Sequence, residues 1–179
     1  LFYFDNAITS FSKASLVFFS IGLLLVYFSS TMYHYVSETK LKKKLQIFDH
    51  ISIYYLILGS YAPVCLITLY NSSGVVIFLI VFLLAIIGTC LKLFFNTKME
   101  LMSLTLYLIM GWLIVFDINT LFELITFKAK ILLISSGLSY TLGVFFYSFD
   151  RIKFFHSVWH IFVMTGSILH YLLILLYII

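Results

Sequence analysis

Three histidines and one aspartate in this 179-residue chain have the residue types and the spacing of a metal site. His156 and His160 are four positions apart, so on a helix they lie one above the other, with their Cβ atoms about 5–6 Å apart. Two imidazoles at this spacing can hold one metal ion. His34 supplies a third imidazole and Asp49 a carboxylate, and both lie at ends of apolar segments. The set predicts a metal centre.

Zinc is the expected metal, because neutral imidazole suits it. Imidazole also binds iron and copper, but less exclusively. A catalytic zinc site uses three protein ligands and leaves a fourth position open for water. With three histidines as ligands, we expect Asp49 to hold that water and accept its proton; the alternative is that Asp49 is itself a ligand. Ser30, four positions before His34, is expected to face the same direction and to hydrogen-bond the water or a substrate carbonyl. Zinc lowers the pKa of such a water toward about 7, which gives a nucleophile at neutral pH.

Ordinary structural roles are expected for several other residues. His50 lies about 100° around a helix from Asp49, so we expect it beside the site or at the membrane interface. His170 comes ten residues after His160, about 15 Å further along a helix, and is expected to be structural. Glycines are expected to permit close packing of helices at positions 59, 111, 137, 143 and 166.

The elements that must position these residues are membrane-spanning helices. The chain is 63% hydrophobic and 10% charged, with a mean hydropathy of +1.14, whereas a soluble domain is about half apolar and about a quarter charged. A bilayer offers backbone groups no partner outside the protein, and the long, unalternated apolar runs are typical of helices rather than of barrel strands. The sequence predicts an all-α polytopic transmembrane bundle, a single integral-membrane domain over residues 1–179. Membrane lipids are the expected partners, and no nucleic acid is expected.

Six spans are predicted, each near the roughly 20 residues that a bilayer core requires. Polar stretches separate them, including the lysine-rich segment 37–46, which is expected to be a loop, and a break at 96–100. Pro63 lies inside the second span and is expected to kink it. The predicted spans are about 15–35, 48–70, 75–95, 101–118, 131–149 and 155–178.

Orientation follows from the positively charged residues in the connections, which are enriched on the cytoplasmic side of a membrane. Eight Lys or Arg residues fall on one side and three on the other. We therefore expect an integral protein of the cell membrane with its lysine-rich loops in the cytoplasm and its C-terminus outside. The three histidines and Asp49 then all fall at the cytoplasmic ends of their spans, and this common depth favours one shared site. The eight residues are Lys40, Lys42, Lys43, Lys44, Lys92, Lys98, Arg151 and Lys153.

The motifs around these residues resemble those of the hemolysin III family, in the same order along the chain. The resemblance runs from about residue 15 to the end. It rests on Ser-x-x-x-His at 30–34, FDHISIYYLILGSYAP at 48–63, LYLIMGW at 106–112, YTLGVFFY at 140–147 and HSVWHIFVMTGSILH at 156–170.

That family is similar to the adiponectin and progestin receptors and, more distantly, to the alkaline ceramidases. The resemblance implies a seven-helix fold with an intramembrane zinc site near the cytoplasmic face. In that site His34, His156 and His160 bind zinc, and Asp49 acts through water. Only six spans are visible here, so we expect the first helix of the family fold to be missing. Residues 1–4 are a candidate for the end of that helix.

Three functions remain open on the sequence alone. The preferred one is a metal-dependent hydrolase of a lipid amide or ester, because an open zinc position lies beside a carboxylate at membrane depth; the choice of an amide, as in a ceramidase, is analogy. The second is a pore-forming or cytolytic protein, as the family name implies, although no polar stripe typical of a channel is visible. The third is a receptor or lipid sensor in which the metal holds helices together. A structural site of this kind usually has a fourth protein ligand, so direct binding of Asp49 would favour this function.

Overall fold

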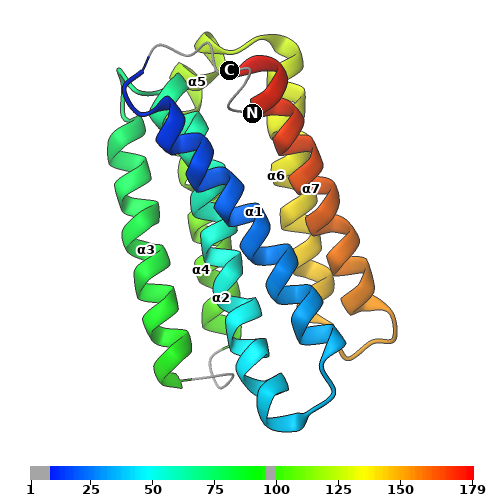
Figure 1. The fold of residues 1–179 in the computed structure, drawn as a ribbon. Coiled ribbons are helices and arrows are strands. Elements are labelled where there is room, and N and C mark those ends of the chain that lie inside the picture. Colours follow the sequence, from blue (N-terminus) through cyan, green and yellow to red (C-terminus); the bar gives the residue numbers. More distant parts are fainter. Residues whose placement is uncertain (1–8, 96–99) are drawn as a thin grey trace.

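The computed structural model describes residues 9–95 and 100–179, and within these ranges it is an all-helical bundle (Figure 1). Six of its helices are long and apolar enough to cross a membrane, which confirms the predicted fold class. The chain is therefore an integral multi-pass membrane protein. The elements are α1 (Ser12–Tyr35), α2 (Thr39–Pro63), the π-helical η2 (Val64–Thr68), α3 (Gly74–Phe95), α4 (Glu100–Trp112), the 3-10 segment η4 (Leu113–Asp117), α5 (Ile118–Leu124), α6 (Phe127–Ser148) and α7 (Phe155–Tyr177).

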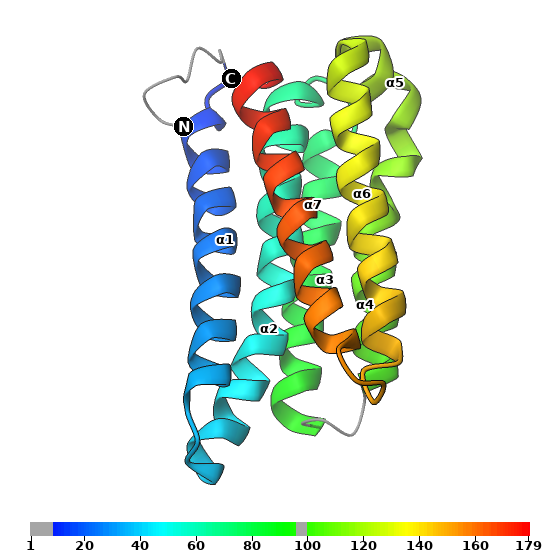
Figure 2. The same ribbon diagram turned by 90° about the vertical axis from the view of Figure 1, so that its right-hand side faces the viewer.

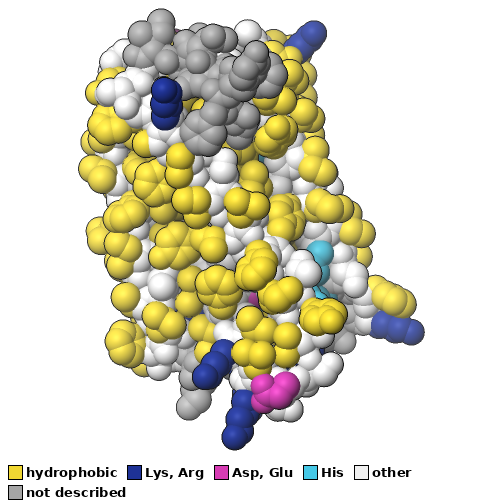
Figure 3. All heavy atoms as spheres, in the orientation of Figure 1, with side chains coloured by type: hydrophobic (Ala, Val, Ile, Leu, Met, Phe, Trp, Pro, Cys, Tyr) yellow, Lys and Arg dark blue, Asp and Glu magenta, His cyan; other side chains and the backbone are white. Residues whose placement is uncertain are grey.

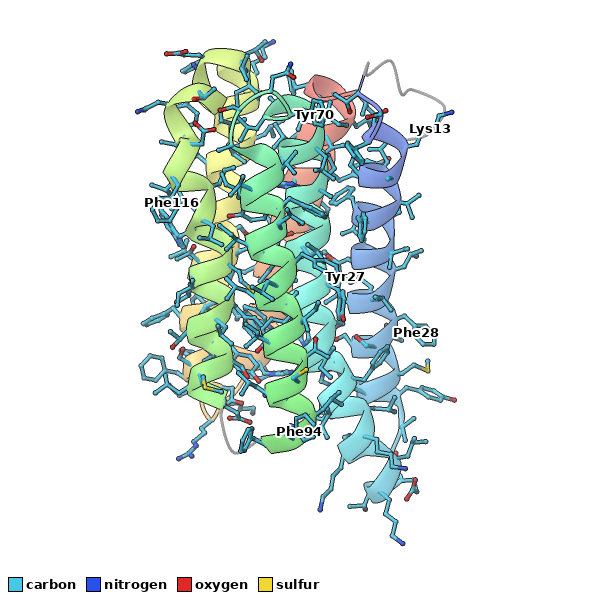
Figure 4. The ribbon with its side chains drawn as sticks, turned by 90° about the vertical axis from the view of Figure 1, so that its left-hand side faces the viewer. Lys13, Tyr27, Phe28, Tyr70, Phe94 and Phe116 are labelled. Atoms are coloured by element: carbon cyan, nitrogen blue, oxygen red, sulfur yellow. The ribbon has the colours of Figure 1, made fainter. Side chains whose placement is uncertain are left out.

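The surface of the bundle has the polarity that a bilayer requires. Hydrophobic side chains cover the middle of the face shown in Figure 3, whereas Lys and Arg lie toward its ends. Phe28 and Phe116 point away from the helices in Figure 4, and 60% and 85% of their surfaces are exposed. Lipid tails can cover such side chains, so these outward faces need no protein partner.

Helices α1 and α2 pack against each other more extensively than any other pair, and two glycines allow them to approach closely. A Cβ atom at Gly22 would lie 2.5 Å from the Tyr55 carbonyl oxygen, and one at Gly59 would lie 2.7 Å from the Phe18 carbonyl oxygen. Helices in membranes commonly use small residues in this way. The contact fixes α1, which carries His34, against α2.

Helix α2 changes its hydrogen bonding at Pro63, where the sequence predicts a kink. The chain continues as the π-helical η2, and the Val64 N–H donates to the Tyr61 carbonyl. In a regular helix this N–H would bond to the Ser60 carbonyl. His170 Nε2 donates to that carbonyl instead, at 2.9 Å. His170 therefore has the structural role that its position in the sequence suggests.

A second break, in which α4 passes through η4 into α5, is stabilised by a side chain from α2. The Tyr61 hydroxyl donates to the Gly111 carbonyl at 2.9 Å and accepts the Ile114 N–H at 2.9 Å. At the end of η4, the Asp117 carboxylate accepts the Ser72 hydroxyl at 2.7 Å, which ties this break to the connection between α2 and α3. The backbone groups freed by the break thus find partners inside the protein, as a bilayer demands.

The lysine-rich segment 37–46 was expected to be a loop, and this prediction is wrong. Helix α2 begins at Thr39, and the Glu38 carboxylate accepts the backbone N–H groups of Lys40 and Leu41, each at 3.0 Å. A carboxylate at this position pairs the free N–H groups of the first turn and interacts favourably with the helix dipole. Helix α2 therefore extends beyond its apolar part, and the α1–α2 hairpin projects past the other helices at the lower end of Figures 1 and 2.

The fourth span also differs from its predicted end at residue 118, because α5 continues it to Leu124. Three features of the sequence analysis lie outside the described residues: residues 1–4, Lys98, and the polar break at 96–100 except for Glu100, which begins α4.

Tyr61→Phe is expected to lower the free energy of unfolding by about 1 kcal/mol, because it leaves the Gly111 carbonyl and the Ile114 N–H without their partner. Tyr54→Phe is the matched control on the same helix. Among the described residues the Tyr54 hydroxyl is buried without a hydrogen-bond partner, so its removal is expected to leave stability unchanged or to raise it. Thermal unfolding of both variants in one detergent makes the comparison. Equal melting temperatures for the two variants would contradict the role given to Tyr61.

Candidate metal centre

The three histidines predicted to bind metal converge where α1 ends and α7 begins. His34 Nε2 lies 3.2 Å from His160 Nε2 and 3.4 Å from His156 Nε2, and the latter two atoms are 3.1 Å apart. His156 and His160 occupy successive turns at the start of α7, so both rings project from one face toward the last turn of α1. Within the described part of the chain, these three residues form a group whose ligand atoms all lie within 4.8 Å of one another.

The triangle of Nε2 atoms has the dimensions of a tetrahedral zinc site. With Zn–N bonds of 2.0–2.1 Å, ligand nitrogens in such a site lie about 3.3–3.4 Å apart. The three nitrogens cannot satisfy one another by hydrogen bonds, because each is either a donor or an acceptor and at least one of the three contacts must join two of a kind. A cation accepts all three lone pairs at once. The histidines are therefore close enough to hold a metal ion, and their arrangement fits zinc.

The histidine triangle lies at the end of the bundle that also carries the α1–α2 connection. His34 is exposed, whereas His156 and His160 are half-buried. Histidine side chains reach the surface toward the lower end of the face shown in Figure 3. The triangle is thus open on one side to the surroundings and faces the interior of the bundle on the other.

Asp49 lies in the wall of the bundle near the triangle but is not part of it, since its carboxylate is not among the ligand atoms that lie within 4.8 Å of one another. The residue is 9% exposed. Ser29 Oγ lies 3.4 Å from Asp49 Oδ1 and 2.8 Å from Ser52 Oγ, and the Ser52 hydroxyl donates to the Asp49 carbonyl at 2.6 Å. Two serines on two helices therefore hold Asp49 in place.

The serine that contacts the Asp49 carboxylate is Ser29, which the sequence analysis missed. Ser30 was selected by its spacing from His34, and it lines the interior cavity, as Asp49 does. Ser29 continues the buried face of α1, whose buried positions recur every three or four residues and end with Val26 and Ser29. That periodicity places Ser29 on the face of α1 that packs against α2.

A cavity of about 540 Å³ begins at His160 and runs along the inside of the bundle. Ser30, Asp49 and His160 line one end, and His170 and Phe122 line the other. The two ends are separated by ten residues of α7, or about 15 Å. Most of the wall between them is apolar. The cavity therefore suits an elongated apolar group with a polar group at the histidine end.

Two glycines predicted to permit helix packing have another effect. A Cβ atom at Gly111 or Gly137 would have no atom within 4 Å, and both residues line the cavity. The packing role is therefore wrong for these two, which instead leave space open. It holds for Gly59, Gly143 and Gly166, where a Cβ atom would lie 2.7–3.0 Å from an atom of a neighbouring helix.

His50 lies beside the site and is not among the residues that line the cavity. Its Nε2 is 3.1 Å from the Tyr147 hydroxyl, and its carbonyl accepts the Tyr107 hydroxyl at 2.7 Å. The Tyr147 ring lies 6.2 Å from the His156 ring, centroid to centroid. His50 thus links α2 to α4 and α6. It also supports Tyr147, whose ring packs against His156. Tyr147 lies 97 residues from His50, so no local sequence pattern connects the two.

Comparison with known proteins gives relatives over most of the chain. A family model described as haemolysin-III related matches residues 1–171. Hemolysin-3 of Bacillus cereus is 35% identical over 170 residues, which cover 95% of this chain and 78% of that protein. A hemolysin-3 homolog of Bacillus subtilis is 37% identical over 163 residues, which cover 91% of this chain and 76% of that protein.

A human protein, the monocyte to macrophage differentiation factor, is 30% identical over 162 residues, which cover 86% of this chain and 66% of that protein. No solved structure matches the chain significantly. The relatives thus come from both bacteria and mammals.

We expect the purified protein in detergent to contain about one zinc ion per chain, and the His156→Ala/His160→Ala double variant to contain none, because two of three ligands are gone. Asp49→Asn is expected to keep its zinc, since the carboxylate lies outside the triangle. Elemental mass spectrometry measures all three. Loss of zinc from Asp49→Asn would show that Asp49 is a ligand.

Proposed function

This chain belongs to the haemolysin-III related family of membrane proteins, and we propose that it is a zinc-dependent hydrolase that cleaves an amide or ester bond in a membrane lipid. One observation carries the proposal: His160, a member of the histidine triangle, lines one end of an apolar cavity together with Asp49 and Ser30. The volume of about 540 Å³ falls within the range of small-molecule sites, roughly 300–1,000 Å³. An acyl chain in this cavity would place its polar end at the histidines.

Zinc, when bound, supplies a Lewis acid that polarises a carbonyl group and lowers the pKa of water. His34, His156 and His160 would hold it. Asp49 accepts a proton from the attacking water as the water oxygen bonds to the carbonyl carbon. Asp49 then returns that proton to the departing nitrogen or oxygen as the C–N or C–O bond breaks. The Ser30 hydroxyl donates to the carbonyl oxygen, where negative charge develops.

Other residues prepare Asp49 for this role. Ser29 and Ser52 fix the carboxylate and its backbone from two sides, so that little reorganisation is needed when a proton is transferred. The apolar wall of the cavity keeps bulk water from the scissile bond. We further propose that this end of the protein faces the cytoplasm, because the lysines of the α1–α2 hairpin lie there.

A metal-clamped lipid sensor is the second candidate. It is favoured by the positions of the three ligands, which join the end of α1 to the start of α7. Such a sensor would lose thermal stability with the metal and would never yield a product. The name of the Bacillus relatives, hemolysin-3, points to lysis. Vesicle leakage that persists without metal would favour that third function.

Asp49→Asn is expected to reduce kcat for lipid-amide or lipid-ester hydrolysis by at least about 10²-fold, because the amide cannot accept the proton. The screen uses zinc-loaded protein with ceramide-type amides and acyl esters, and mass spectrometry detects the released fatty acid. The zinc content and melting temperature of the variant are expected to match those of the wild type. Full turnover by Asp49→Asn would exclude Asp49 as the base.

Gly137→Leu is expected to block long acyl chains without affecting the metal, because the new side chain occupies open cavity space. With a long-chain substrate KM should rise at least about tenfold, as for a steric block of several methylene groups in an apolar pocket. A substrate with a two- to four-carbon acyl group should be cleaved as by the wild type. If long and short chains are affected equally, the acyl chain does not occupy this cavity.

A further inference from the structure

One lysine of the α1–α2 hairpin differs from its neighbours. Lys42 is half-buried, whereas Lys40, Lys43 and Lys44 are exposed. The Lys42 Nζ lies over the Tyr33 ring, 5.5 Å from its centroid. A cation held over an aromatic face is electrostatically attracted to it, so the Lys42 ammonium group has a defined position.

The Lys42 ammonium group lies next to the candidate metal centre. The Tyr33 ring lies 4.8 Å from the ring of His34, centroid to centroid, and His34 is the exposed member of the triangle. Tyr33 therefore connects the ammonium of Lys42 to the open side of the metal centre. The nearest carboxylate in sequence, Glu38, accepts two backbone N–H groups at the start of α2, so its charge is directed at the helix rather than at Lys42.

Positive charge also flanks the other side of the triangle. Arg151 and Lys153 are exposed in the connection that leads into α7, and Lys153 lies over the Phe154 ring at 4.9 Å. Among the described residues, exposed or half-exposed cations at this end of the bundle outnumber exposed carboxylates. The cations are Lys40, Lys42, Lys43, Lys44, Arg151 and Lys153, and the carboxylates are Glu38, Glu100 and Asp150.

An elongated apolar cavity on one side of the triangle and a fixed ammonium on the other suit one class of molecule. We propose that Lys42 recognises an anionic headgroup, and that the lipid acted on at the metal centre is an acyl lipid whose headgroup carries a phosphate. The acyl chain lies in the cavity, the scissile carbonyl lies at the histidines, and the phosphate lies beside Lys42. This inference rests on the proposed function, whose substrate class it narrows.

A purely topological role for the lysines makes a different prediction. Lys40, Lys42, Lys43 and Lys44 contribute equally to orientation in the membrane, and none of them would then distinguish one bound lipid from another. Only a headgroup contact makes Lys42 more important than Lys43, which lies on the same turn and is exposed.

The test measures binding of two water-soluble lipids, dihexanoyl phosphatidate and dihexanoyl phosphatidylcholine, to the full zinc-loaded chain in a neutral detergent by isothermal titration calorimetry. We expect the wild type to bind the phosphatidate more tightly. Lys42→Gln should weaken phosphatidate binding roughly fivefold, the effect of about 1 kcal/mol per basic residue near an anionic lipid. Lys42→Arg should restore it, and Lys43→Gln should have less than half the effect.

Lys130→Gln is the matched control, because Lys130 also lies 5.5 Å over an aromatic ring, that of Phe122, but at the opposite end of the bundle. It should leave binding unchanged. Equal binding of the two lipids by the wild type, or equal losses in Lys42→Gln and Lys43→Gln, overturns the proposal. So does inorganic phosphate binding as tightly as the phosphatidate, because the site would then recognise phosphate without a lipid.

The His156→Ala/His160→Ala variant separates this inference from the proposed function. If it loses the preference for phosphatidate although Lys42 is intact, the metal selects the phosphate and the role of Lys42 is wrong. If the wild type contains no zinc, the hydrolase proposal fails, yet a Lys42-dependent preference for phosphatidate can still be observed.

Discussion

Hydrocarbon offers no hydrogen-bond partner, so a backbone group that a helix break sets free inside this bundle needs one from a neighbouring helix. The two helix breaks show the constraint directly. After Pro63 the Val64 N–H no longer pairs with the Ser60 carbonyl, and His170 from α7 donates to that carbonyl instead; where α4 becomes η4, Tyr61 from α2 pairs with both the Gly111 carbonyl and the Ile114 N–H. Each irregularity in one helix is thereby tied to a side chain of another. The breaks make the packing more specific, and they help to fix the walls of the cavity.

The same constraint gathers polar side chains at the lysine-rich end. Asp49 is held by serines of two helices, and His50 pairs with a tyrosine of α6. Lys92, only 2% exposed, donates to Ser103 at 3.4 Å. These pairs lie in α1, α2, α3, α4 and α6, so most of the bundle contributes to a polar layer around the histidine triangle. A metal ion is the most effective partner for three adjacent imidazoles, which hydrogen bonds alone cannot satisfy.

Much of this arrangement was predictable from local patterns. Long apolar runs require helices in a membrane, and the spacing of His156 and His160, with His34 at a matching depth, predicted the triangle. Features that depend on packing between distant segments were not predictable in the same way. The choice between Ser29 and Ser30 depends on which face of α1 meets α2, and the open space at Gly111 and Gly137 depends on the volumes of side chains from several helices. The early start of α2 depends on a cap at Glu38, which a reading of hydropathy alone overlooks.

The ligand triangle closes a loop of 126 residues between His34 and His160. During synthesis the first ligand enters the membrane early, while the other two arrive only with the last helix. The site consequently does not exist in any partly made chain, and a bound ion would stabilise only bundles in which α7 has inserted and docked against α1. Metal binding would then report that α7 has inserted and docked. A chain that stops before α7, or inserts α7 wrongly, would lack the stabilisation by a bound ion.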